Sequence, residues 1–138
     1  MKGYLLIFFT VLLWGTAPIL DKIALKNSQI LVGIFVRSVA VFSSIVLIFT
    51  FSQGFKLLKS SSYRDILLFA LSGIGAGLLG MFSYYGALKY LPSSKVVPLC
   101  STYPLVSAIL AFLFLNESLT LLRILGIILI IIGIWLVK

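Results

Sequence analysis

Five long apolar stretches divide this chain of 138 residues and restrict it to very few folds. An α-helix rises about 1.5 Å per residue, so roughly 20 residues cross the ~30 Å hydrocarbon core of a bilayer. Each stretch has about this length, which is too long for the strand of a β-barrel. The chain is therefore predicted to be an all-α integral membrane protein with five transmembrane helices. We place them at about residues 3–25, 29–51, 66–88, 96–115 and 121–137.

The composition indicates lipid as the solvent for most of the chain. Hydrophobic residues make up 62% of it, charged residues only 10%, and the mean hydropathy is +1.24. Soluble domains hold about 25% charged residues. A chain this apolar cannot cover itself with polar surface in water, so we expect a multi-pass protein of the bilayer. The links between the stretches are short, which predicts a single domain over residues 1–138 and antiparallel neighbouring helices.

Charge and titratable residues exclude several function classes. The formal charge is +8, but the Lys and Arg residues are scattered between apolar stretches and form no basic stripe for nucleic acid. The chain has no His, one cysteine at Cys100 and three acidic residues far apart. A metal site or a hydrolytic triad needs a denser set of such groups. We therefore predict no enzyme activity, no cofactor, no metal and no nucleic-acid partner.

An arginine interrupts the second apolar stretch. Arg37 stands about seven residues, or roughly 10 Å, beyond the start of that stretch. An unpaired cation at such a depth costs at least ~2.5 kcal/mol, so the side chain must face protein or water. Asp21, near the end of the first stretch, is the expected ion-pair partner. Arg37 either forms a structural pair or snorkels to the near face, or it lines a substrate path and attracts anionic groups.

Further polar and aromatic residues fall in or near the layer of Arg37. Depth counting places two tyrosines and a serine there, and Trp14 nearer the midplane. Pro104 lies in the fourth stretch, where it removes a backbone N–H and bends the helix. Ordinary core packing is the alternative role for the aromatic residues. The predicted substrate-path residues are Trp14, Arg37, Tyr84, Ser101, Tyr103 and Pro104.

Spaced glycines predict faces where helices pack closely. On an α-helix, Gly73 and Gly77 share one face of the third stretch, with Gly80 one turn further. Gly126 and Gly133 are seven residues apart on the fifth stretch. Small residues let backbones approach in lipid, and the partner is a helix of the same chain or of a second chain.

Four segments follow one another along the chain: "LLWGTAPILDKIAL", "FVRSVAV", "YYGALKYLPSSKVVPLCSTYPLVSAILAFLFLNESLT" and "LGIILIIIGIWLV". In this order they resemble the EamA domain of the drug/metabolite transporter superfamily, and the resemblance covers essentially the whole chain. The resemblance implies secondary transport or export of small metabolites or drugs across the cytoplasmic membrane by alternating access. Better-known members carry two such domains in inverted orientation with the path between them, which implies a working pair here.

The basic residues other than intramembrane Arg37 give no clear bias that would fix the orientation of the chain. With five spans they divide five against five, and a bias in Lys and Arg is what normally fixes topology. We therefore predict an antiparallel homodimer in the cell membrane; an inverted partner half and a parallel homodimer are the alternatives. A non-transporting membrane subunit or scaffold of a larger complex is the alternative function. The two sets are Lys2, Lys56, Lys59, Arg64 and Arg123 at one face and Lys22, Lys26, Lys89, Lys95 and Lys138 at the other.

Overall fold

The computed structural model describes residues 2–118 and 120–136, and regular structure within them is entirely helical. The prediction of an all-α protein is therefore confirmed. The chain divides into two compact units, Met1–Lys89 and Tyr90–Lys138. Each unit is described by itself below.

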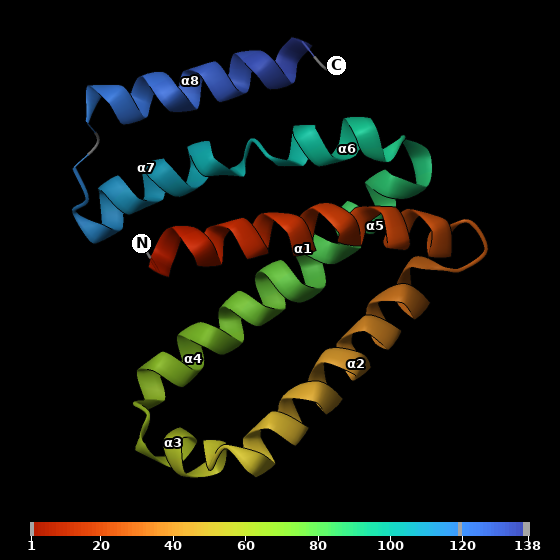
Figure 1. Cartoon of the computed structure of the whole chain (residues 1–138), viewed down its shortest axis with the longest axis vertical. Helices are drawn as coiled ribbons and strands as arrows, with labels where there is room; N and C mark the ends of the chain where they lie inside the picture. Colours follow the sequence, from red (N-terminus) through yellow and green to blue (C-terminus); the bar gives the residue numbers. More distant parts are fainter. Residues whose placement is uncertain (1, 119, 137–138) are drawn as a thin grey trace. The chain divides into compact units, whose positions relative to one another are not determined.

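The first unit is built from two membrane-length helices and a third long helix that returns to the first. Figure 1 shows α2 running from the end of α1 to the short α3, and the following helix running back until α5 reaches α1. The segments α4, η1 and α5 follow one another without a break and form a single apolar helix over Tyr63–Tyr90. The elements are α1 (Lys2–Leu25), α2 (Ile30–Phe51), α3 (Gly54–Ser60), α4 (Tyr63–Ser72), η1 (Gly73–Gly80) and α5 (Met81–Tyr90).

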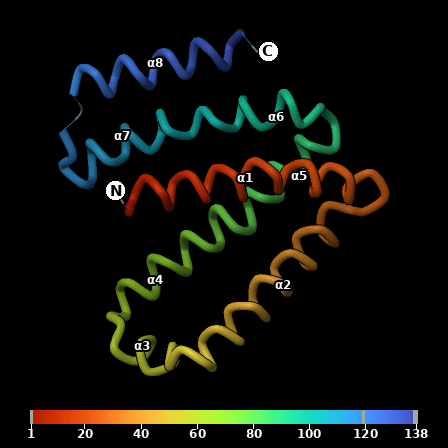
Figure 2. Tube along the Cα trace, viewed as in Figure 1, coloured from red at the N-terminus to blue at the C-terminus, as the bar shows by residue number. Residues whose placement is uncertain are grey.

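The second unit is a helical hairpin whose first arm is broken. That arm consists of α6 (Ser93–Cys100) and α7 (Tyr103–Leu115), and the return arm is α8 (Leu121–Leu136). Pro104 stands in the first turn of α7, where its missing N–H leaves no helix bond unmade. Figure 2 shows α8 running back beside the first arm, and α8 contacts α6.

Four helices of the described chain are long and apolar enough to cross a membrane. α8 is apolar too, but its 16 residues extend only about 24 Å, somewhat less than the hydrocarbon core. Residue 137, the last of the fifth predicted span, lies outside the described residues. The four long helices are Lys2–Leu25, Ile30–Phe51, Tyr63–Tyr90 and Ser93–Leu115.

Apolar side chains cover the outside of these helices. Phe8, Phe42 and Phe69 are more than half exposed, and so are most other large apolar residues of the described chain. In water such continuous apolar surface would drive aggregation, whereas lipid tails solvate it at no cost. The chain is therefore a multi-pass membrane protein.

The middle of the third long helix is a π-helix, η1, over the sequence "GIGAGLLG". Hydrogen bonds in this register run from i to i+5, so each turn holds more residues than an α-turn. The face expected for Gly73, Gly77 and Gly80 assumed α-helical geometry, and the role of these three glycines in helix packing stays a prediction.

Candidate functional site

Three side chains from three helices meet near one end of the first unit. Asp21 comes from the last turns of α1, Arg37 from the first third of α2 and Tyr85 from the middle of α5. Counted from the nearest helix end, they lie about 6, 10 and 8 Å into their helices. We call Asp21, Arg37 and Tyr85 the Arg37 cluster.

Tyr85 holds the carboxylate of the cluster more firmly than Arg37 does. The Tyr85 hydroxyl donates a hydrogen bond of 2.8 Å to Asp21 Oδ1. Arg37 Nη1 lies 3.4 Å from Asp21 Oδ2 and 3.5 Å from the Tyr85 hydroxyl oxygen. A strong charge-assisted bond measures about 2.7–2.9 Å, so the contacts of Arg37 are long and weak. The guanidinium is therefore attached loosely to a carboxylate that Tyr85 keeps in place.

Arg37 keeps hydrogen-bonding capacity for a further partner. Its side chain is 47% exposed, against 19% for Asp21. Within residues 2–118 and 120–136, its hydrogen bonds and its ion pair all run through Nη1. A guanidinium carries five N–H donors in a planar fork that fits carboxylate or phosphate. The Nη2 and Nε edge can therefore bind an anionic group while Asp21 stays in position.

A glycine on α2 brings Tyr85 to the cluster. A Cβ atom added to Gly33 would stand 3.1 Å from the Tyr85 ring, so a larger residue would push the ring away. Gly33 and Arg37 are one helical turn apart and share a face of α2. Lys22 Nζ donates a hydrogen bond to the carbonyl oxygen of Leu88, which also ties the end of α1 to α5. Gly33 therefore sets the position of the tyrosine hydroxyl relative to the guanidinium.

Tyr85 is the residue of this cluster that the sequence did not single out. We expected Tyr84 in the layer of Arg37, and its ring packs at 6.3 Å and 42° to that of Tyr85. The hydroxyl that binds Asp21 nevertheless belongs to Tyr85, which is 2% exposed. The sequence carries no signal for this distinction, because Leu88, the buried apolar residue that follows, is three residues from Tyr85 and four from Tyr84 and so shares a helix face with either. A role for Tyr84 in the substrate path stays a prediction.

The contacts described for the Arg37 cluster include none of the other predicted path residues. Trp14 is 68% exposed on α1, and no described hydrogen bond or ring contact joins it to the Arg37 cluster. Ser101, Tyr103 and Pro104 belong to the second unit, at the break between α6 and α7. The Ser101 hydroxyl donates a hydrogen bond of 2.8 Å to the Val97 carbonyl oxygen and so gives this acceptor at the end of α6 a partner. Their place in one polar layer with Arg37 stays a prediction.

The glycines predicted for helix packing are open in each unit. If a Cβ atom is added to any of these glycines, no described atom of another helix in the same unit lies within 4 Å of it. Gly80 comes near only the carbonyl oxygen of Gly75, on the same π-helix. Close packing of these faces against a helix of the same chain or of a second chain stays a prediction for Gly73, Gly77, Gly80, Gly126 and Gly133.

Replacing Tyr85 by phenylalanine is expected to destabilise the first unit. The change removes the hydroxyl that binds Asp21 and keeps the ring against Gly33. Hydrogen bonds between helices in membranes contribute about 0.6–1.7 kcal/mol, and we expect a loss of free energy of unfolding in this range. Titration of the purified protein from mild detergent into sodium dodecyl sulfate measures it.

Tyr63→Phe is the matched control, because Tyr63 is 80% exposed and the part of the chain that the structure describes gives its hydroxyl no hydrogen bond. We expect Y63F to unfold like the unmodified protein. Equal unfolding free energies for Y85F and Y63F would show that the bond to Asp21 contributes nothing.

Comparison with known proteins places the chain in a family. The model of the EamA-like transporter family matches residues 1–138. Over 79 residues the chain is 40% identical to a protein of Photorhabdus laumondii subsp. laumondii named "Probable 4-amino-4-deoxy-L-arabinose-phosphoundecaprenol flippase subunit ArnF". Over 71 residues it is 42% identical to an uncharacterized protein of Methanocaldococcus jannaschii. No solved structure matches.

Both relatives match over part of their length. The match to the Photorhabdus protein covers 56% of this chain and 63% of that protein. The match to the Methanocaldococcus protein covers 51% of this chain and 52% of that protein. The family model, by contrast, covers the chain from its first residue to its last. The chain therefore belongs to the EamA-like transporter family.

Proposed function

We propose that this chain moves a small substrate carrying an anionic group across the cell membrane. The observation that carries the proposal is the Arg37 cluster, a half-exposed guanidinium loosely paired with Asp21 between membrane-spanning helices. Intramembrane cations are expensive and mark substrate or ion paths more often than packing contacts. A cation kept only for structure would be expected to bind its carboxylate at short distance and be buried with it.

The contacts in the cluster favour a simple exchange of partners. An anionic group binds the Nη2 and Nε edge of Arg37, and the weak bond between Nη1 and Asp21 breaks or lengthens. Tyr85 holds Asp21 at 2.8 Å during this exchange, so the carboxylate is not left unsatisfied. When the substrate leaves, Asp21 neutralises the guanidinium again. Asp21 thus competes with the substrate and keeps binding weak enough for release.

We propose that two such halves form the working unit. The resemblance implies that better-known family members pair inverted halves, and in many transporters built from inverted repeats the substrate binds near the middle of the membrane at the repeat interface. Trp14, Tyr84, Ser101, Tyr103 and Pro104 would then line the path together with Arg37, and alternating access would come from rocking of one half against the other. The name of the Photorhabdus relative describes it as a subunit and its cargo as a phosphate-bearing lipid sugar, and both points support this proposal.

The second candidate is a non-transporting subunit or scaffold of a larger membrane complex. The same relative favours it, because the word "subunit" in its name implies another chain. In this role the Arg37 cluster would only hold α1, α2 and α5 together. A half-exposed guanidinium is unnecessary for that purpose, so we favour transport.

Solute flux in proteoliposomes tests the proposal. Purified protein is reconstituted alone, and efflux is measured for matched sets of anionic, neutral and cationic metabolites. We expect accelerated efflux of one or more anionic solutes and none for neutral solutes of the same size. Efflux of every set at the rate of protein-free liposomes would contradict transport by this chain alone and favour the subunit.

A further inference from the structure

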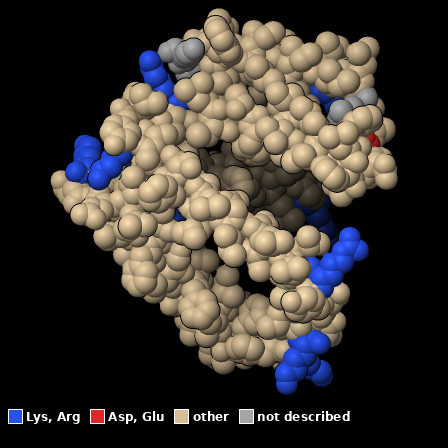
Figure 3. Space-filling view, turned by 180° about the vertical axis from the view of Figure 1, so that it is seen from behind, with Lys and Arg blue, Asp and Glu red and all other residues tan. Residues whose placement is uncertain are grey.

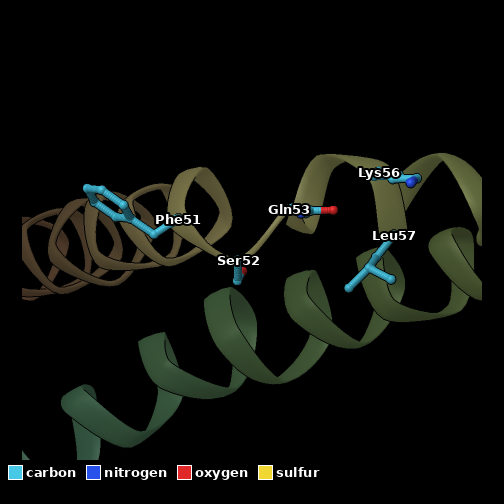
Figure 4. A pocket seen from close by; sticks show the side chains of 5 residues that line it. All are labelled: Phe51, Ser52, Gln53, Lys56 and Leu57. Carbon is cyan, nitrogen blue, oxygen red and sulfur yellow. The ribbon is translucent and has the colours of Figure 1, made fainter.

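A pocket of about 280 Å³ opens at the turn between α2 and α3, far along α2 from the Arg37 cluster. Since the turn joins the two membrane-spanning helices Ile30–Phe51 and Tyr63–Tyr90, it must lie at a membrane surface. Figure 4 shows α3 continuing from the turn, with the side chains that line the pocket on both sides of it. These residues are Phe51, Ser52, Gln53, Lys56 and Leu57.

The backbone of this turn is held in one conformation. Gln53 has a φ of 55°, in the left-handed region, and so redirects the chain from α2 into α3. The next residue, Gly54, lies against the ring of Phe49, and an added Cβ atom would stand 2.5 Å from that ring. Phe49 and Phe55 pack edge to face at 5.7 Å. Aromatic packing therefore fastens α3 to the end of α2, beside the pocket.

The lining of the pocket is amphipathic. Lys56 and Gln53 supply a cation and an amide, whereas Phe51 is 87% exposed and Leu57 65% exposed. The Ser52 hydroxyl already donates a hydrogen bond of 2.6 Å to the Ile48 carbonyl oxygen. The Lys56 ammonium and the NH2 group of the Gln53 amide are thus donors suited to an anion, and they stand beside apolar surface at the end of a membrane-spanning helix.

The surroundings of the pocket are basic. Lys59 and Arg64 lie on α3 and at the start of α4, close to Lys56 in sequence, with Asp65 as the one acidic neighbour. In Figure 3 the basic side chains at the lower right lie over this part of the molecule. Among residues 2–118 and 120–136, no salt bridge involves Lys56, Lys59 or Arg64. The positive charge of the turn is therefore available to a partner outside the chain.

We infer that this pocket binds the headgroup of an anionic phospholipid. The phosphate pairs with Lys56 and accepts a hydrogen bond from the Gln53 amide, and the glycerol and acyl portion lies against Phe51 and Leu57. A water molecule takes about 30 Å³ of the liquid, so 280 Å³ leaves room for a phosphate with part of its glycerol. A soluble anion would use only the polar groups of the pocket, whereas a lipid also contacts Phe51 and Leu57, which is why a lipid fits better. The inference does not depend on the proposed transport.

Lipid retention by the intact protein tests the inference. The protein is reconstituted in vesicles of phosphatidylglycerol and phosphatidylcholine, extracted in mild detergent, and the ratio of the two lipids still bound is measured by native mass spectrometry. A basic residue near an anionic membrane surface contributes about 1 kcal/mol, so Lys56→Gln should lower the preference for phosphatidylglycerol about fivefold. Lys56→Arg should retain it.

Lys26→Gln is the matched control, because Lys26 is an exposed lysine in the turn between α1 and α2, outside the pocket. We expect K26Q to keep the preference for phosphatidylglycerol. Gly54→Val keeps every charge and displaces Phe49 and α3, so it should lower the preference as K56Q does. An equal loss in K26Q and K56Q would show an effect of net charge only and overturn the pocket. No preference in the unmodified protein, or none lost in K56Q, would overturn it as well.

Discussion

Replacing Arg37 by alanine is expected to abolish transport, with a loss of flux of about 30-fold or more. Truncating one member of a hydrogen-bonded charge pair costs about 2–5 kcal/mol, and the lower value corresponds to that factor. The substrate loses its cation, and Asp21 remains beside Tyr85 as an uncompensated negative charge that repels anions. Efflux of the anionic solute from proteoliposomes measures the effect.

Insertion into the membrane should survive this substitution. Removing a charge makes the second span more apolar and so easier to insert. Arg123→Ala is the matched control, because Arg123 lies in the first turn of α8 and its Nη1 donates 3.3 Å to the Ser118 carbonyl oxygen. We expect R123A to transport normally. An R37A protein that inserts and transports at full rate would reduce Arg37 to a structural role.

Each terminus of the chain is expected on both sides of the membrane. If five helices span, five Lys and Arg residues lie at each face, so no bias directs insertion. Two copies inserted in opposite directions reproduce the inverted halves of larger family members. The test uses variants with a single cysteine at Lys2 or Lys138, made together with Cys100→Ser. In intact cells we expect a membrane-impermeant maleimide to label only part of the molecules of each variant.

Permeabilised cells give the total for each variant and serve as the control. A dual-topology chain leaves a labelled and an unlabelled fraction at both positions. If Lys2 variants react fully and Lys138 variants not at all, or the reverse, the antiparallel homodimer is wrong. The next step would then be to search for a different chain that inserts in the opposite orientation and pairs with this one.

Hydropathy predicted the helices well but not their ends. The third stretch was expected at 66–88, whereas the helix extends over Tyr63–Tyr90; the fourth was expected from 96, whereas α6 begins at Ser93. Polar residues at these ends continue a helix beyond the hydrocarbon, where an apolar pattern no longer detects it. Helix α3 was missed for a related reason, since seven residues are too few to show a helical period.

The sequence indicated the depth at which the Arg37 cluster lies. It did not indicate which side chains at that depth point toward one another. The cost of an intramembrane cation and the shallow position of Asp21 indicated their pairing, and the two side chains lie 3.4 Å apart. Counting residues along α5 gave the right layer but could not distinguish Tyr84 from Tyr85, which point in directions about 100° apart. The contact between Gly33 and the Tyr85 ring, which makes this distinction, exists only in the folded chain.

Access of water to Arg37 is the most direct test of the account. A water-soluble arginine reagent, hydroxyphenylglyoxal, is added to both sides of proteoliposomes, and modification of each arginine is followed by mass spectrometry of its peptide. Arg64, exposed at the start of α4, is the internal reference. If Arg37 lines a substrate path, it reacts on the same timescale as Arg64, and the transported anion slows the reaction at Arg37 alone. Complete modification of Arg64 with Arg37 untouched would contradict a substrate path through this site.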